Sequence, residues 1–202
     1  MKKILYTALM TMLVIVLGAC NGNKTNTISV AELTDREKDI LSMTTNDAFL
    51  FDFNIDDTYQ EVEFWVEKYE SGKLVDEKIN HGTAPVYGNG SLIFARTQSP
   101  EDENQFTFIT GIETEDDDES DQSNISSLVK EKKGLENASI TTRVLNDDRP
   151  IIKGEMALAS ICYTLDEDGA TALSNDFYED PTSNMEELKE FDLVYLLKGE
   201  FK

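Results

Sequence analysis

The sequence predicts a mainly β fold, an antiparallel β-sandwich with two or three short helices, and three observations support this prediction. Aromatic residues recur with a period of two from Phe49 to Phe53, which places them on one face of a strand. A second alternating run, residues 62–66, is followed by Ser71-Gly72, a pair typical of a two-residue hairpin turn. Residues 156–163 are apolar at nearly every position, as expected for a central strand buried on both faces.

The first strands lie within residues 46–80, which we expect at the centre of an antiparallel sheet. A two-residue turn at Ser71-Gly72 predicts that Phe64 lies opposite Ile79 and Trp65 opposite Lys78. Residues 81–90, which include Pro85 and Asn89-Gly90, are predicted to form a loop. Further strands are predicted at residues 91–97 and 105–112, at 138–145 and 151–165 as a hairpin, and at 192–201.

Three segments are predicted to be helical, namely residues 29–43, 125–133 and 183–191. Ser29 and Thr34 are each followed three residues later by glutamate, so two capping boxes compete for the start of the first helix. In the second segment, Ile125 and Leu128 form an apolar stripe, and Gly134 occupies the position that follows many helices.

One domain is expected for a chain of 202 residues, and no repeat or interior linker divides residues 29–202. The predicted sandwich resembles immunoglobulin-like domains. The alternative is an α+β fold, a twisted open antiparallel sheet packed by the helices.

The N-terminus carries the most specific motif in the sequence. The positively charged Met1-Lys2-Lys3 is followed by an apolar run that ends at Leu17-Gly18-Ala19-Cys20. This pattern resembles the lipobox of bacterial lipoproteins, which lipoprotein signal peptidase cuts before a cysteine that carries diacylglycerol. The resemblance implies a signal peptide over residues 1–19, lipidation of Cys20 (with palmitate-type acyl chains), and a flexible tether over residues 20–28. An uncleaved transmembrane anchor is the alternative, but the apolar run is short for a span of ~20 residues.

Two or three acyl chains would anchor the chain stably, because each buried CH₂ contributes ~0.8 kcal/mol. We therefore expect a protein tethered to the extracytoplasmic face of the cell membrane. The whole chain resembles small, single-domain lipoproteins of Gram-positive bacteria, and that resemblance brings no catalytic residues with it.

The strongly acidic composition limits the partners of the protein. The formal net charge is −22, and loss of Lys2 and Lys3 with the signal peptide takes it to −24. Nucleic-acid binding is not expected, because phosphates require a basic surface. Direct binding of the protein surface to anionic lipids is not expected either. The partner of the mature domain is therefore expected to be a protein or a glycan.

No enzymatic motif stands out, so an enzyme is not expected. His81 is the only histidine, and Cys162, in an apolar run, is predicted to be a buried small residue. The Ser127-to-Lys130 spacing matches Ser-x-x-Lys by chance, since its companion motifs are absent. A secreted hydrolase that uses paired carboxylates is the catalytic alternative, although 40 acidic residues make such pairs inevitable.

Two candidate binding sites follow from the pattern of side chains. Trp65 and Tyr69 share a strand face with glutamates and could form a platform for a glycan or a protein, the alternative being that they are buried. Asp116, Asp118 and Asp121 offer hard oxygen ligands for Ca²⁺, the alternative being a solvated acidic loop. No other cofactor is expected. These observations favour a non-enzymatic binding module of the cell envelope, with a calcium-dependent adhesion module as a further alternative.

Overall fold

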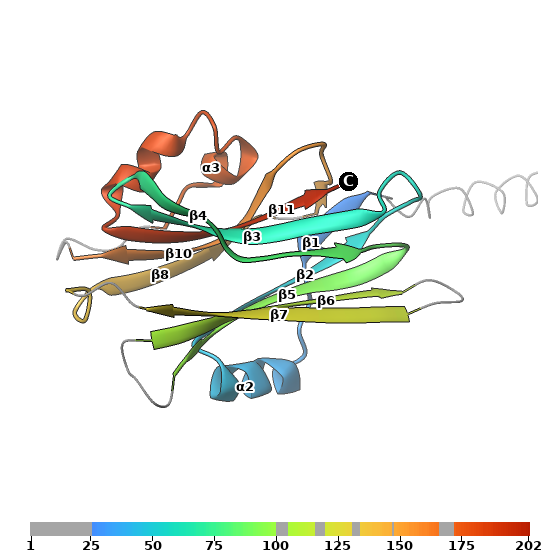
Figure 1. The fold of residues 1–202 in the computed structure, drawn as a ribbon, viewed down its shortest axis with the longest axis horizontal. Helices are drawn as coiled ribbons and strands as arrows, with labels where there is room; N and C mark the ends of the chain where they lie inside the picture. Colours follow the sequence, from blue (N-terminus) through green and yellow to red (C-terminus); the bar gives the residue numbers. More distant parts are fainter. Residues whose placement is uncertain (1–25, 100–104, 116–119, 131–133, 147, 166–171) are drawn as a thin grey trace, which may run out of the picture.

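Two antiparallel β-sheets pack face to face, which confirms the predicted sandwich (Figure 1). The computed structural model describes residues 26–99, 105–115, 120–130, 134–146, 148–165 and 172–202. Sheet A has the strand order β7-β6-β5-β2-β1-β9, and sheet B has the order β4-β3-β11-β10-β8. Helix α2 lies outside sheet A, whereas α3 and the 3₁₀ helix η1 lie outside sheet B (Figure 1).

The elements follow one another in this order: β1 (Thr27–Val30), α2 (Asp35–Thr44), β2 (Asp47–Asn54), β3 (Glu61–Glu70), β4 (Lys73–Pro85), β5 (Asn89–Gln98), β6 (Gln105–Glu115), β7 (Ser120–Lys130), β8 (Ser139–Val144), β9 (Arg149–Pro150), β10 (Met156–Thr164), α3 (Asn175–Glu179), η1 (Met185–Glu190) and β11 (Leu193–Phe201). The predicted strands at 91–97, 105–112, 138–145 and 192–201 are thus confirmed as β5, β6, β8 and β11.

The core lies between the sheets and is rich in aromatic rings. Phe53 on β2 contacts Phe201 on β11 at a centroid distance of 5.4 Å, and Phe108 on β6 contacts Tyr195 on β11 at 5.2 Å. The predicted face of Phe49, Phe51 and Phe53 points into this core, because their exposed fractions are 7% or less. Alternation then sends the intervening side chains of β2 to the outer face of sheet A.

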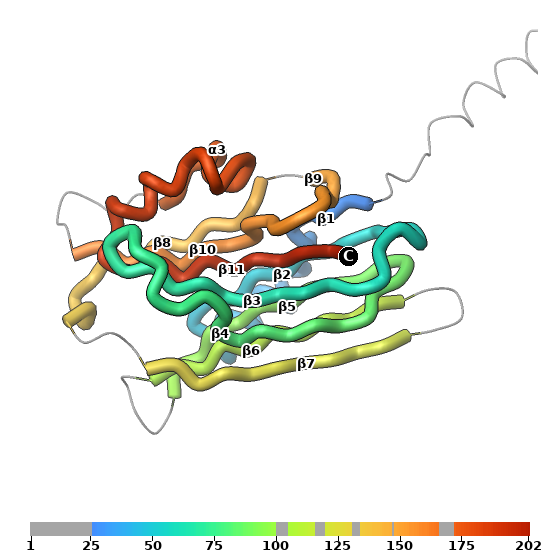
Figure 2. The backbone as a smooth tube through the Cα atoms, turned by 45° about the horizontal axis from the view of Figure 1, so that its top comes forward, coloured from blue at the N-terminus to red at the C-terminus, as the bar shows by residue number. Residues whose placement is uncertain are grey.

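The stretch of residues 46–80 does not form one sheet, contrary to the prediction. Its first strand, β2, pairs with β1 and β5 in sheet A, whereas β3 and β4 form a hairpin in sheet B. The hairpin leaves β4 at the edge of its sheet, next to β7 at the edge of the other sheet (Figure 2). The centre of sheet B is instead β11, with β3 and β10 on its two sides.

The predicted turn is confirmed, but the predicted hairpin register is wrong. Ser71 and Gly72 both have positive φ, and Tyr69 lies opposite Leu74. Two single-residue shifts along β4 then place Ile79 opposite Val66 rather than opposite Phe64, and a third shift places Gly82 opposite Phe64. Each β-bulge adds one unpaired residue and bends the edge strand. Residues 81–85, which were predicted to lie in a loop, belong to the same continuous strand β4.

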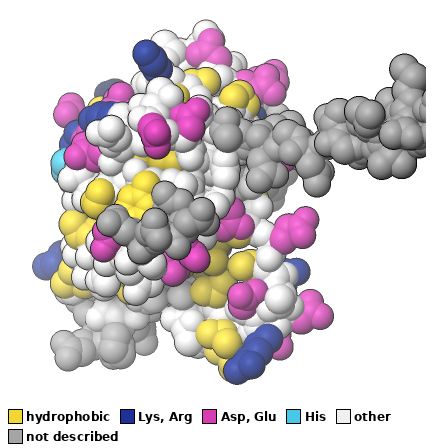
Figure 3. Space-filling view, turned by 90° about the vertical axis from the view of Figure 1, so that its right-hand side faces the viewer, with side chains coloured by type: hydrophobic (Ala, Val, Ile, Leu, Met, Phe, Trp, Pro, Cys, Tyr) yellow, Lys and Arg dark blue, Asp and Glu magenta, His cyan; other side chains and the backbone are white. Residues whose placement is uncertain are grey.

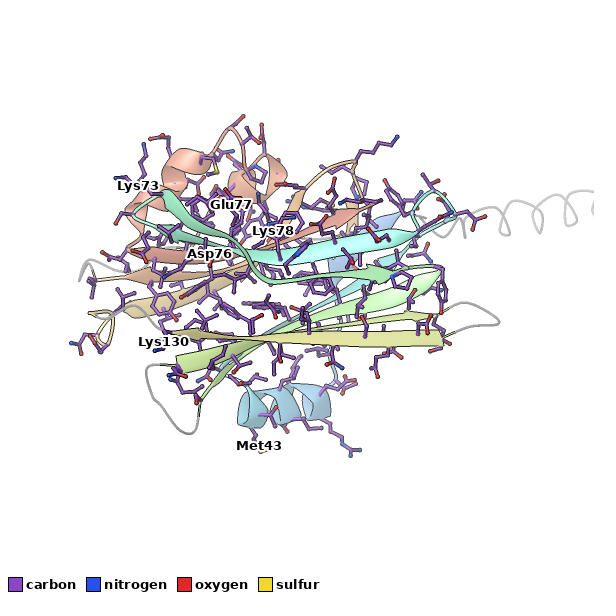
Figure 4. All side chains as sticks on the ribbon, viewed as in Figure 1. Met43, Lys73, Asp76, Glu77, Lys78 and Lys130 are labelled. Carbon is purple, nitrogen blue, oxygen red and sulfur yellow. The ribbon has the colours of Figure 1, made fainter. Side chains whose placement is uncertain are left out.

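The first predicted helix begins later than its Ser29 start. Ser29 lies in β1, opposite Asp52 of β2, and the capping box of Thr34 and Glu37 starts α2. The Thr34 hydroxyl accepts a hydrogen bond from Glu37 N–H, and the Glu37 carboxylate accepts one from Thr34 N–H at 2.8 Å. No residue of α2 is buried, and Met43, 77% exposed, points away from sheet A (Figure 4).

The second predicted helix is wrong, because residues 120–130 form strand β7. Ile125, Ser127 and Val129 are half-buried, whereas the residues between them are exposed, with Leu128 at 63%. The 125, 128, 129 spacing also satisfies a helix, and small polar residues on β7 hide its period of two. Pairing with β6 over eleven residue pairs fixes the strand.

The outer face of sheet B is covered by the segment that contains α3 and η1. Phe177 and Tyr178 of α3 and Leu188 of η1 are buried, and η1 confirms part of the predicted helix at 183–191. Cys162 is a buried free thiol under this cover, and burial raises its pKa to about 11. This is the structural role predicted for it.

Candidate functional site

The predicted platform residues Trp65 and Tyr69 are buried, with exposed fractions of 3% and 4%. Both side chains bind Glu67: Trp65 Nε1 donates to Oε1 at 3.3 Å, and the Tyr69 hydroxyl donates to Oε2 at 2.6 Å. Lys198 of β11 completes this group with an ion pair to Glu67 at 2.9 Å. Trp65 and Tyr69 therefore stabilise sheet B and offer no platform to a partner, which is the alternative raised from the sequence.

The neighbouring carboxylate, Glu63, is also saturated with partners. It binds Lys202, Lys78 and His81, the last with 2.8 Å between Oε1 and Nε2. Lys202 and Lys78 together, with a smaller contribution from His81, hold the pKa of Glu63 at about 2, against the opposing effect of burial. Lys78 (Figure 4) also lies over the Trp65 ring at 5.2 Å. In this cluster, residues 63, 65, 67, 78, 81, 198 and 202, the ion pairs of the two glutamates surround the Trp65 ring.

The proposed calcium ligands are not assembled within the described residues. Asp121 lies on β7 with an exposed side chain opposite Thr114, and Asp116 and Asp118 lie outside the described ranges. Across residues 26–202, apart from the gaps given above, no three His, Cys, Asp or Glu side chains are close enough to hold a metal ion. The acidic segment at 116–119 is untested by this finding.

A polar hollow of about 400 Å³ lies on the outer face of sheet A. Four neighbouring strands build it from residues that face away from the core, in two cross-strand rows. One row is Ser29, Asp52, Ser91 and Glu113, and the other is Thr27, Asn54, Asn89 and Glu115. Ser91 Oγ donates to Asp52 Oδ1 at 2.8 Å, and Asn54 Nδ2 donates to Asn89 Oδ1. We call this the polar hollow.

Gly90 makes the close packing behind the polar hollow feasible. A Cβ atom at this position would overlap the Phe53 ring on one side and the Glu113 carbonyl oxygen on the other. The Asn89-Gly90 pair was predicted to be a turn, but both residues lie at the start of β5. The glycine therefore serves strand packing rather than a turn conformation.

A second hollow, of about 640 Å³, lies where the two sheets end beside the β2–β3 and β4–β5 connections. Its apolar and aromatic lining is formed by Ile55, Tyr59, Pro85, Val86 and Tyr87. Asp56 and Asp57 line it as well, together with Gln60 and Gly88. We call this the end hollow. It adjoins the polar hollow, because Ile55 N–H donates to the Gly88 carbonyl directly after Asn54 and before Asn89.

Both hollows lie at the end of the sandwich where the described chain begins. Thr27 lines the polar hollow, and Asn26 Nδ2 donates to Asp56 Oδ2 at 2.9 Å beside the end hollow. Figure 3 views this end and shows acidic side chains spread over it, with apolar side chains between them. Cys20 lies outside the described residues. None of the helices in the described part has the length and hydrophobicity to cross a membrane.

No residue of either hollow was predicted from the sequence to belong to a binding site, although several were named there as parts of strands, caps or turns. The polar hollow could have been found from the polar residues that alternate with the phenylalanines of β2, had the cross-strand register been known. The end hollow joins two connections that the whole β3–β4 hairpin separates in sequence, and no local pattern marks that pairing.

The comparison with protein-family models gives one match, to a family described as the YgaN domain, over residues 27–201. The match spans both sheets and both hollows. No curated protein and no solved structure was found to match the chain.

Proposed function

The chain belongs to the YgaN domain family, and for this member we propose a membrane-anchored extracytoplasmic lipoprotein that acts as a non-enzymatic binding module of the cell envelope. The lipobox-like sequence ending at Cys20 supports the anchor. Two adjacent hollows at the end of the sandwich where β1 begins support the binding role.

The position of the hollows carries the proposal. The tether predicted over residues 20–28 must end earlier, because Thr27 pairs with Asn54 in β1 and Asn26 donates a hydrogen bond to Asp56. Five residues, 21–25, separate Cys20 from Asn26, and a flexible tether of that length would have an r.m.s. reach of about 12 Å. A lipid on Cys20 would therefore keep both hollows close to the extracytoplasmic surface of the cell membrane. The acidic residues at this end would keep the domain from lying flat on anionic lipids, so the hollows would stay open to ligands.

Mass spectrometry of the native protein tests the anchor. We expect a chain that starts at Cys20 and carries diacylglycerol on its thiol, and we expect membrane fractions to retain it. Cys20→Ala should lose the acyl mass, whereas the control Cys162→Ala should keep it, because Cys162 is a buried thiol of β10. An intact Met1 without an acyl group on Cys20 would contradict the proposal.

A carboxylate-dependent hydrolase is the second candidate, and the polar hollow gives it a specific basis. Asp52 and Glu113 occupy the same row on strands two positions apart, so their backbones lie about 10 Å apart. Inverting glycosidases hold their two carboxyl groups roughly 6.5–9.5 Å apart. If this candidate is right, purified protein should release sugars from envelope polysaccharide, and Asp52→Asn or Glu113→Gln should abolish the release.

A further inference from the structure

We propose that the end hollow binds an organic ammonium group, carried either by a small solute or by a lipid headgroup. The inference deepens the binding role proposed above and depends on it. It rests on the shape of the hollow, on the charge of its lining and on the aromatic rings that the lining contains.

The hollow has the size typical of a small-molecule site. Its volume of about 640 Å³ lies within the range of roughly 300–1,000 Å³ for ligand pockets. Ile55, Val86 and Tyr59 are at least nine-tenths buried and form a fixed lining, since their exposed fractions are 4%, 3% and 8%.

The charge of the lining selects a cation. Asp56 and Asp57 contribute two carboxylates, and none of the described residues that line the hollow is Lys or Arg. Asp56 is already engaged: Thr58 and Asn26 donate hydrogen bonds to it, which lower its pKa. Asp57 is exposed and has no ion-pair or hydrogen-bond partner among the described residues. Its carboxylate is therefore free to accept a cation.

The aromatic rings select an organic cation rather than a metal ion. Tyr59 and Tyr87 both line the hollow, and ammonium groups bind favourably over the faces of such rings. A metal ion would need several converging oxygen ligands, and the described residues provide no group of three acidic or histidine side chains for it. Aromatic rings combined with one available carboxylate are suited to an alkylated ammonium ion, which is weakly hydrated and partly apolar.

Titration of the mature full-length lipoprotein in neutral detergent micelles tests the inference. Choline chloride is the soluble probe, and 3,3-dimethylbutan-1-ol, which has the same shape without the charge, is the matched control ligand. We expect choline to bind in calorimetry and the neutral alcohol not to bind. The inference would be overturned if choline and the neutral alcohol bound equally well. It would also be overturned if no binding were seen either here or in the vesicle experiment below.

Variants then locate the site. Asp57→Asn, on an exposed side chain, and Tyr87→Leu should each weaken choline binding about fivefold or more, consistent with the energy of a cation–π or charge contact. Asp39→Asn, an exposed carboxylate of α2 that lines neither hollow, is the matched control and should bind choline as the parent protein does. If Asp57→Asn bound choline with the affinity of the parent protein, the assignment to the end hollow would be overturned. This holds even if Tyr87→Leu fails to fold.

A second arm distinguishes the two sources of the ammonium group. Protein reconstituted in phosphatidylcholine vesicles is compared with protein in phosphatidylglycerol vesicles, using the fluorescence of a probe attached near Asp57. A shift in phosphatidylcholine alone supports the headgroup, and binding of free choline with no such shift supports the solute. The acyl mass on Cys20 is measured separately, so failure of ammonium binding is distinguishable from failure of the proposed anchor.

Discussion

At the residue scale, Glu63 shows how a strand face rich in charge can still be a stable part of the fold. Only 9% of the residue is exposed, yet its carboxylate is surrounded by Lys78, His81 and Lys202. A buried charge is tolerated when it is paired and hydrogen-bonded in this way. The residues around Trp65 that resemble a binding platform in the sequence are therefore structural.

The lowered pKa of Glu63 gives a test by pH. A carboxyl group with a pKa of about 2 in the folded state and 4.5 in the unfolded state contributes stability above pH 4.5 and loses it as the pH falls toward 2. We expect Glu63→Gln to lower the free energy of unfolding at pH 7 by about 1 to 2 kcal/mol. Between pH 5 and pH 2.5 the variant should lose stability less steeply than the parent.

Urea unfolding at a series of pH values measures this difference. Glu77→Gln is the control, because Glu77 is an exposed residue on the same strand as Lys78 (Figure 4). Parallel stability curves for the parent protein and Glu63→Gln would show that the ion pairs contribute nothing to the acid sensitivity.

Gly90 provides a second test at this scale. Gly90→Ala should destabilise the protein by about 2 kcal/mol, because the new methyl group would overlap the Phe53 ring and the Glu113 carbonyl. Gly111→Ala, on the adjacent β6, is the matched control, since its Cβ would meet only the Ser123 carbonyl oxygen at 3.9 Å. Thermal unfolding should separate the two variants, and equal melting temperatures would contradict the packing role of Gly90.

At the scale of elements, the sequence is informative wherever one period dominates. The phenylalanines of β2 and the continuous apolar run of β10 each admit only one interpretation, and both strands were predicted correctly. β7 was missed because an edge strand with one exposed face needs few apolar residues, and those it has also fit a helical stripe. The pairing of β7 with β6 makes the segment a strand rather than a helix, and that pairing is a tertiary contact.

The hairpin register illustrates a second limit of sequence-based prediction. Turn chemistry fixes the pairing beside Ser71-Gly72, where Glu70 lies opposite Lys73 as a two-residue turn requires. Farther along, bulges shift the register, and Asn80 adopts a positive φ within β4. Its side chain donates to Thr110 on β6, so a contact between sheets supports the distortion. Local sequence contains no sign of that contact.

Helix α2 allows a test of local stability. Thr34→Ala removes the hydroxyl of the capping box and should destabilise the helix by about 1 kcal/mol. Because α2 buries no residue, the midpoint of global unfolding should scarcely change. Hydrogen exchange of amides in residues 35–44 should accelerate about fivefold, and exchange in β2 should not. Thr44→Ala, at the other end of the helix, should leave the first turn unchanged.

At the scale of the whole molecule, the fold class followed from the sequence, but the hollows did not. The polar hollow joins side chains from β1, β2, β5 and β6, and the end hollow joins two connections between strands. Each depends on the order of strands in a sheet, which residue periodicity does not specify. The buried platform residues show the converse. The aromatic and acidic side chains of β3 suggest a binding surface in the sequence, but in the fold Lys198 of β11 and Lys78 of β4 lie against them.

The net charge of the molecule gives the last test. A chain with a formal net charge of −22 repels itself, and salt screens this repulsion over a Debye length of about 10 Å at 0.1 M. We therefore expect the melting temperature to rise by several degrees between 10 and 300 mM NaCl.

CaCl₂ at matched ionic strength separates screening from binding at the acidic segment that contains Asp116, Asp118 and Asp121. A solvated loop predicts the same melting temperature with Ca²⁺, Mg²⁺ or chelator, whereas tight binding must raise it further with Ca²⁺ alone. Asp118→Asn should then remove the extra rise, and its persistence would show that Ca²⁺ binds elsewhere.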